Sequence, residues 1–236
     1  HEGKSFKYIV GNPPFFTIKS ENEEIQFLRE FRKVINGVEV KAKDIVGHNQ
    51  ISQAFMLKLK DWSDVETHFG FVQNSSNFYN EKSANFQKFF FTNYRVERFY
   101  ELSRVKDILF RKAKESVVVA IFNNKQVENN VLDYYPVEMG LFSKTFDLLI
   151  IQEDKKIKIS QQDILDKKVV LRDYLIGNEH DLRLLRKLSN NKKLEEFLLK
   201  DKRYSSIEGL KRISSKDLET QYKGLEIEDT GLYAIE

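Results

Sequence analysis

The sequence predicts an α/β fold: a mostly parallel sheet with an antiparallel strand, followed by a mainly helical partial module. Strand-like and helical segments alternate over the first 124 residues, as they do in chains that build parallel sheets. Two consecutive strands in this part have no convincing helix between them, which indicates antiparallel neighbours. From residue 161 to residue 216 the pattern is mainly helical, so a second module is expected to begin between residues 130 and 180.

The first predicted strand spans residues 6–11 (FKYIVG), which are apolar and β-branched with no polar face, as in a strand covered on both sides. A helix is expected over residues 20–37. Ser20 and Glu23 have the spacing of a capping box, an apolar stripe follows them, and Gly37 is a helix stop.

Residues 38–49 are expected to form a loop before a second helix over residues 51–62. Residues 68–74 predict a strand, and the polar run NSSNFYN predicts a loop at its carboxyl end. One face of the second helix is expected to carry Ile51, Phe55, Leu59 and Trp62. The remaining expected elements are a short helix near residues 85–91, strands over 95–102, 116–124, 131–137 and 146–152, and a hairpin within residues 224–236 that turns at Asp229 to Gly231.

The composition excludes several classes of protein. The absence of cysteine rules out disulfides and thiolate metal sites and agrees with a reducing, cytoplasmic compartment. The four histidines lack metal-ligand spacing, and no apolar run approaches ~18 residues, so neither a metal nor a membrane is expected as a partner. Basic residues collect in 95–114 and 183–212, which would suit nucleic acid or the solvated faces of helices.

Residues 12–16 (NPPFF) directly follow the first predicted strand and contain two of the three prolines of the chain. Proline has a fixed φ and no N–H, so this exit loop is stiff, and its carbonyl groups are free to accept hydrogen bonds from a ligand. Open α/β sheets place their sites at the carboxyl ends of parallel strands, where this loop is expected. A simple Asx-Pro turn that ends the strand is the structural alternative.

The segment FKYIVGNPPFF resembles the catalytic motif of amino-group methyltransferases, and best resembles that of the bacterial DNA adenine-N6 methyltransferases of restriction-modification systems, type IIG or type I-like. FGFVQNSSNFY (69–79) is similar to the strand and polar loop that follow in those enzymes. RVERFYELSRVKDILFRKAKESVVVAIF (95–122) is similar to their later strand pair. The resemblance covers about residues 5–124 and implies half of a Rossmann-like methyltransferase sheet.

The resemblance also implies roles for the residues of the NPPF motif. In the family, the Asn side-chain oxygen and the carbonyl of the first Pro accept the two hydrogens of the target amino group, which implies Asn12 and Pro13, with Pro14 completing the motif. The aromatic residue stacks on an adenine flipped out of double-stranded DNA, which implies Phe15. We expect the next residue, Phe16, in the core.

A second aromatic residue contacts the flipped base in the family, and Phe110 in DILFRKAK is the matching position. The alternative for Phe110 is a hydrophobic anchor between two strands. Asn77 and Phe78, in the polar loop after the 68–74 strand, could touch substrate, but a polar loop at a strand end often only solvates its own backbone. These two residues are therefore left out of the catalytic set.

The sequence departs from the family in its cofactor motif. The family binds S-adenosylmethionine through a Gly-rich turn followed by an acidic strand end, whereas none of the ten glycines here forms a G-x-G pair. We therefore expect an incomplete, inactive fragment whose partner is the missing N-terminal half of the same polypeptide. Residues 1–150 would be the C-terminal part of the catalytic domain, and residues 151–236 the linker and start of a target-recognition region, since YLIGNEHDLRLLRKLSNN is similar to such a linker.

Two other functions remain open at this point. The glutamine methyltransferases that act on release factors share Asn-Pro-Pro-aromatic, because an amide nitrogen also has a delocalised lone pair. They typically end soon after the sheet, whereas this chain has a long extension. The chain could also be a non-catalytic module that binds DNA or a partner protein.

Overall fold

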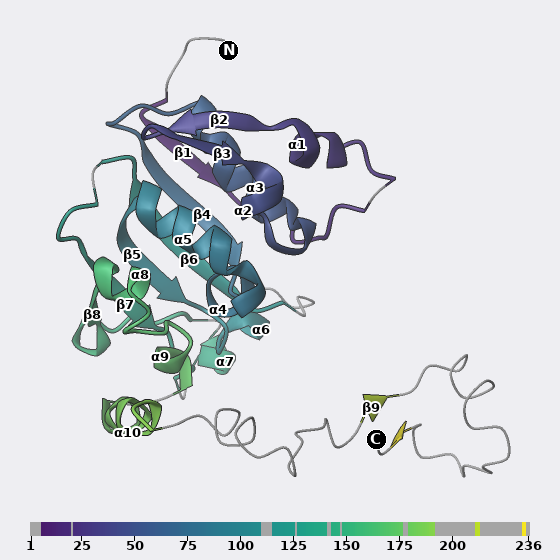
Figure 1. Cartoon of the computed structure of the whole chain (residues 1–236). Coiled ribbons are helices and arrows are strands. Elements are labelled where there is room, and N and C mark those ends of the chain that lie inside the picture. The colour runs from purple at the N-terminus through teal and green to yellow at the C-terminus, as the bar shows by residue number, and fades with distance from the viewer. Residues whose placement is uncertain are drawn as a thin grey trace, which may run out of the picture. The chain divides into compact units, whose positions relative to one another are not determined.

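The computed structural model describes residues 6–19, 21–109, 115–125, 127–140, 143–146, 148–176, 179–191, 211–212 and 233–234 (Figure 1). The chain divides into two compact units, residues 1–178 and 179–236, which are considered separately. Residues 151–176 lie in the first unit. The domain boundary expected at residue 150 stays a prediction. The assignment of the C-terminal part to a recognition region stays a prediction.

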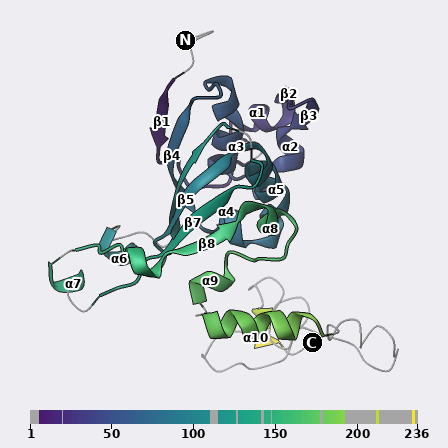
Figure 2. The same ribbon diagram turned by 90° about the vertical axis from the view of Figure 1, so that its left-hand side faces the viewer.

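The first unit is built on a six-stranded sheet in the order β1-β4-β6-β5-β7-β8 (Figures 1 and 2). Two neighbouring pairs, β1 with β4 and β5 with β7, are parallel, and the other three pairs are antiparallel, so β6 and β8 run against the other four strands. This confirms the predicted mixed α/β fold and the antiparallel pairing of β5 with β6. The strands are β1 Tyr8–Gly11, β4 His68–Asn74, β5 Arg95–Glu101, β6 Val117–Asn123, β7 Val131–Pro136 and β8 Ile157–Ser160.

Strand β1 lies at one edge of the sheet and, among the described residues, pairs with β4 alone, from Tyr8 opposite His68 to Gly11 opposite Phe71. A Cβ atom on Gly11 would lie 2.8 Å from Cε1 of Phe71, so a larger residue there would have to displace the Phe71 ring. Val10 is 81% exposed. The expectation that β1 is covered on both faces is therefore wrong for the described part of the chain.

Helices α3 and α5 lie over one face of the sheet, as Figures 1 and 2 show. The core beneath them is rich in aromatic residues: the rings of Phe69 and Phe122 stack with centroids 4.8 Å apart, and Tyr94 donates a hydrogen bond to the Met56 carbonyl at 2.7 Å. Each fully buried Phe contributes about 1.5–3 kcal/mol, so this layer holds the sheet and helices together. The helices of the first unit are α1 Ile25–Glu30, α2 Ala42–Ile45, α3 Ile51–Lys58, α4 Ser76–Tyr79, α5 Ala84–Asn93, α6 Lys106–Leu109, α7 Ser143–Phe146, α8 Gln161–Leu165 and α9 Asp173–Ile176, with 3-10 turns η1 Gly47–Asn49, η2 Leu59–Asp61, η3 Glu81–Ser83 and η4 Glu153–Lys155.

The single helix predicted over residues 20–37 is wrong. Only α1 (Ile25–Glu30) is helical, and it is followed by a hairpin of β2 (Arg32–Ile35) and β3 (Val38–Lys41). The hairpin turns at Asn36 and Gly37, which have φ of 50° and 78°. Asn-Gly is the dipeptide that a two-residue hairpin turn favours, because both central residues need positive φ.

Three further expectations are corrected. The strand predicted over residues 146–152 does not form, and the strand that pairs with β7 is β8, residues 157–160. The helix predicted over residues 51–62 forms as α3 and η2, and its expected apolar face is only partly buried, because Phe55 and Trp62 are exposed whereas the polar Gln53 is fully buried. The loop predicted over residues 38–49 contains β3, α2 and η1.

In the second unit the structure describes helix α10 (Glu179–Ser189) and a short antiparallel pair, β9 (Lys211–Arg212) with β10 (Tyr233–Ala234). The hairpin predicted at Asp229 to Gly231 lies outside the described residues. No helix in the described part of either unit is long and apolar enough to cross a membrane.

Candidate functional site

The NPPFF loop leaves β1 at the carboxyl end of the parallel strands, as the sequence predicted. Asn12 is exposed, and its side chain has no hydrogen-bond partner among the described residues. Pro13 is buried and Pro14 is exposed. The stiff loop therefore presents a free amide side chain at the edge of the sheet where open α/β folds bind ligands.

The far end of the loop is fixed to the start of helix α3. The backbone N–H of Ile51 donates to the Phe16 carbonyl at 3.1 Å, and the N–H of Ile18 donates to the Asn49 carbonyl at 2.8 Å. Since β1 holds the other end, both flanks of residues 12–15 are tied to regular structure. Such support is what a preorganised site needs.

The Phe15 ring is half-buried against an apolar cluster at the carboxyl ends of the central strands. Its stacking role stays a prediction, because the ring has both a packed and an exposed part. Phe16, expected in the core, is instead 42% exposed. Its carbonyl is used by α3, so the backbone anchors this position while the side chain remains in solvent. The buried members of the cluster are Leu102, Val105, Val117, Tyr135 and Val137.

A buried carboxyl group, Glu101, lies at the carboxyl end of β5 and was not predicted from the sequence. It is 1% exposed. The backbone N–H of Ser103 donates to it at 2.9 Å, and the hydroxyl groups of Ser103 and Tyr79 also donate to it. The Ser103 hydroxyl lies 3.0 Å from that of Ser75. Glu101 thus links the turn after β5 to the loop and helix that follow β4.

Burial raises the pKa of Glu101 to about 7, although the hydrogen bonds from Ser103 and Ser75 act in the opposite direction. The neighbouring residues Leu102 and Val105 belong to the cluster that supports Phe15. Glu101 therefore contacts the segments that support the NPPFF loop, and its carboxyl group is not exposed at the carboxyl edge of the sheet. The signal in the sequence was a carboxylate at the end of β5 placed between Tyr100 and Leu102.

Asn77 and Phe78, which were left out of the catalytic set, are both buried. The Asn77 side chain donates to Gln73 and Ser52 and accepts from Gln53, each at 3.0 Å. This network joins α3 to α4 and faces away from solvent, so neither Asn77 nor Phe78 is placed to touch a substrate. Phe110 lies outside the described residues, and its role stays a prediction.

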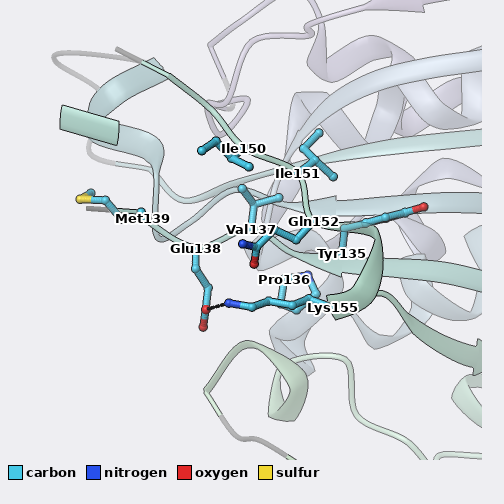
Figure 3. Close-up of a pocket in the computed structure, with 10 residues that line it drawn as sticks. Tyr135, Pro136, Val137, Glu138, Met139, Ile150, Ile151, Gln152 and Lys155 are labelled. Atoms are coloured by element: carbon cyan, nitrogen blue, oxygen red, sulfur yellow. Dashed lines mark hydrogen bonds and ion pairs between the residues drawn. The ribbon is translucent and has the colours of Figure 1, made fainter. Parts of the chain in front are cut away.

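A small cavity opens beyond the carboxyl end of β7, between Tyr135 to Gly140 and Ile150 to Lys155 (Figure 3). At its mouth Glu138 accepts from Lys155 at 2.7 Å, as the dashed line in Figure 3 shows, and this bond is the main cause that lowers the pKa of Glu138. The volume is about 90 Å³. Ligand sites usually have volumes of about 300–1,000 Å³, so this cavity is too small for a nucleoside.

Two groups at the carboxyl edge are placed to contact a ligand. Asn12 supplies an oxygen acceptor, and the Phe15 ring supplies apolar surface. A nucleoside cofactor needs a close backbone approach, and the chain has no G-x-G turn to provide it. Among the described residues, no group of three or more His, Asp or Glu side chains could hold a metal ion.

The sheet order and the reversed strand β6 between β4 and β5 give a Rossmann-like sheet, with the NPPFF loop at the end of β1. Residues 1–108 match the family model of the Eco57I restriction-modification methylase. This match confirms the resemblance to restriction-modification methyltransferases that the sequence predicted. No curated protein matches the chain.

One solved structure supports the fold, and two others of lower TM-score are similar to parts of the chain. A chain of a type I restriction-modification system aligns with a TM-score of 0.51 at 11% identity, covering 84% of this chain and 44% of its own. The type IIG restriction endonuclease BpuSI gives 0.48 at 17% identity, covering 90% and 25%. The type I methyltransferase subunit from Streptococcus thermophilus gives 0.47 at 12% identity, covering 72% and 38%. The chain thus spans less than half the length of each of these proteins.

Proposed function

We propose that this chain is the amine-positioning part of a DNA adenine-N6 methyltransferase of a restriction-modification system. The observation that carries the proposal is the Asn12 side chain: it is exposed and unbonded among the described residues, on a stiff NPPF loop at the carboxyl end of a parallel strand. The match of residues 1–108 to a restriction-modification methylase supports the same function.

The chemistry requires two acceptors on one amino group. The lone pair of adenine N6 is delocalised into the ring, so the nitrogen is a weak nucleophile until its two hydrogens are held out of the ring plane. The Asn12 Oδ1 and Pro13 carbonyl oxygen would accept these hydrogens, with Pro14 fixing the loop between them and Phe15. The methyl group itself would come from S-adenosylmethionine, bound by residues outside this chain.

The target base would be flipped from double-stranded DNA to reach this edge. Stacking on Phe15 would stabilise the flipped base by ~1–3 kcal/mol, which offsets part of the few kcal/mol lost on unstacking. Phe110 would contact the base from another side. The half-exposed Phe15 ring agrees with this role, because its buried part packs on the sheet while the rest stays open to a ligand.

A strand from outside these 236 residues would complete the sheet at β1. In the described part of the chain the outer edge of β1 has no partner strand, and its Tyr8 and Val10 side chains are largely exposed. An exposed edge of this kind favours pairing with a further strand. The cofactor site would then lie on the added strands, next to Asn12.

The test uses the protein encoded by the full reading frame, incubated with S-adenosylmethionine and mixed-sequence DNA. Digestion and mass spectrometry of the nucleosides should detect N6-methyladenine. Asn12→Ala should lower the single-turnover rate by ~10²-fold or more, by analogy with loss of a preorganised transition-state contact, while DNA binding changes little. Asn85→Ala is the matched control, because Asn85 is exposed on α5 and only donates to the Asp44 carbonyl.

An Asn12→Ala rate within a few-fold of wild type would overturn the role of Asn12. Methylation found on a glutamine of a release-factor peptide, with none on DNA, would overturn the proposed substrate.

A further inference from the structure

A large cleft lies at the amino edge of the sheet, at the opposite ends of the parallel strands from the NPPFF loop. The tip of the β2–β3 hairpin, the ends of η2 and α5, the turn after β6 and helix α8 form its walls. Its volume is about 840 Å³, within the range of ligand sites. The lining residues used below are Lys33, Lys60, Asn93, Asn124, Lys125 and Glu128.

Lys60 is the central polar group of the cleft. Its ammonium group donates to the Asn93 carbonyl at 2.8 Å and to Oδ1 of Asn124, and it lies 4.2 Å from the centroid of the Tyr94 ring. All of these partners are neutral. No carboxylate in the described part of the chain lies within 4.0 Å of this half-buried cation.

The carboxylate of the next residue in the chain, Asp61, is already shared by two other lysines. Asp61 binds Lys33 at 2.5 Å and Lys58 at 2.6 Å. Burial and the charge of Lys33 together lower the pKa of Lys60 to about 8, as expected for a partly desolvated cation without a counter-ion. An anion in the cleft would supply that counter-ion.

The rest of the lining is mixed. Lys125 adds a positive charge at the rim, paired with Glu66 at 3.6 Å, while Glu128 is an exposed carboxylate that would oppose an anion. The exposed side chains of Val34 and Val65 form an apolar part of the cleft wall. A ligand that fits these walls has an anionic group for Lys60 and an apolar part for the valines.

We propose that this cleft binds the phosphate group of a nucleotide, with Lys60 as the main cation and Lys33 and Lys125 at its sides. The phosphate could belong to a free nucleotide or to the backbone of a nucleic acid, and both present the same chemistry to Lys60. The site lies on the opposite edge of the sheet from Asn12. It stands whether or not the proposed methyltransferase function is correct.

The test titrates the 236-residue chain with three probes: inorganic phosphate, AMP and a short oligodeoxynucleotide. Lys60→Met should weaken binding about tenfold or more, because a charge-assisted hydrogen bond is lost. Glu128→Gln should strengthen binding, because it removes the opposing charge. Lys168→Met is the matched control, since Lys168 is exposed and pairs with Asp163 and Asp166 outside the cleft.

The three probes distinguish the two possible sources of the phosphate group. AMP binding that depends on Lys60 assigns a free nucleotide, whereas Lys60-dependent binding of the oligonucleotide alone assigns a nucleic-acid backbone. In the wild-type chain, NMR signals of the Asn93 and Asn124 side-chain amides should shift with the probe, which keeps the test valid if Lys60→Met fails to fold. Absence of shifts with all three probes, or equal affinity in wild type and Lys60→Met, would overturn the site.

Discussion

At the carboxyl edge of the sheet an acid, Glu101, is buried among hydroxyl and amide donors, whereas at the amino edge a base, Lys60, is half-buried among amide acceptors. Burial disfavours the charged form of both, so it raises one pKa to about 7 and lowers the other to about 8. The consequences differ. Glu101 ties strand-end loops together beneath the NPPFF loop, while Lys60 lines an open cleft.

The partners of Glu101 and Lys60 show which parts of each sheet edge are held in fixed positions. The donors around Glu101 come from two segments of the chain, the loop and helix after β4 and the turn after β5, so this one carboxyl group fixes their relative positions. The acceptors around Lys60 come from the end of α5 and the turn after β6, and the cleft beside them stays open to solvent. The carboxyl edge is therefore built to hold a rigid loop, and the amino edge to admit a ligand.

The largest expected effect concerns whether the carboxyl edge of this chain can bind the methyl donor. Asn12 and Pro13 could hold an amine, but this chain has no Gly-rich turn for the methyl donor. Residues 1–236 alone should therefore show no measurable binding of S-adenosylmethionine and no methyl transfer to DNA. Titration calorimetry with the cofactor and a tritiated-methyl assay check this, and micromolar cofactor affinity would refute it.

The next effect is a pH dependence set by Glu101. Its pKa is about 7 in the folded chain against an ordinary 4.5, so the folded state binds this proton more tightly than the unfolded state. The free energy of unfolding should therefore fall as pH rises from about 4.5 to 7, by about 3 kcal/mol from this group. Urea unfolding at stepped pH should show that Glu101→Gln removes this slope, whereas Glu39→Gln, on the exposed β3 position, keeps it. An unchanged slope in Glu101→Gln would mean that Glu101 is ionised in the folded chain.

Glu101 also shows why the sequence predicted one part of the site and not the rest. The NPPFF loop is local: a strand, two prolines and an Asn stand in one stretch, so its place at the carboxyl edge could be predicted. The Glu101 network joins Tyr79, Ser75 and Ser103, which come together only through the register of β4, β6 and β5. Pairing between distant strands cannot be inferred from spacing in one sequence.

The hairpin at residues 32–41 shows a conflict between two local signals. The apolar stripe through Phe31 and Ile35 has helical spacing, yet the same residues flank Asn36–Gly37, the strongest short hairpin signal. In the structure the turn prevails, because both residues adopt the positive φ that Asn and Gly tolerate. The stripe predicted the helix correctly only over α1, residues 25–30.

A smaller effect tests the rigid loop through Phe15. In the protein from the full reading frame, Phe15→Ala should weaken the flipped state by about 1–3 kcal/mol, the usual worth of a base–aromatic stack. The fluorescence gain of 2-aminopurine at the target base should then fall. Phe16→Ala is a matched control, because Phe16 is the adjacent ring but is exposed and lies outside the apolar cluster. If the gain is unchanged in Phe15→Ala, the ring serves only to pack on the sheet.

The smallest effect is a second pH dependence, at the amino edge, with the opposite sign. The pKa of Lys60 is about 8 in the folded chain against an ordinary 10.5, so between these values the unfolded state binds more protons. The free energy of unfolding should therefore rise as pH increases from about 8 towards 10. The rise should be smaller than the fall set by Glu101, because solvent reaches Lys60 and screens its charge.

Urea unfolding of wild type and Lys60→Met at each pH isolates the effect, since titration of Tyr94 is common to both proteins. Lys168→Met should follow wild type. A Lys60→Met curve parallel to wild type from pH 8 to 10 would show that the Lys60 ammonium is fully solvated, and the contrast between the two edges would then rest on Glu101 alone.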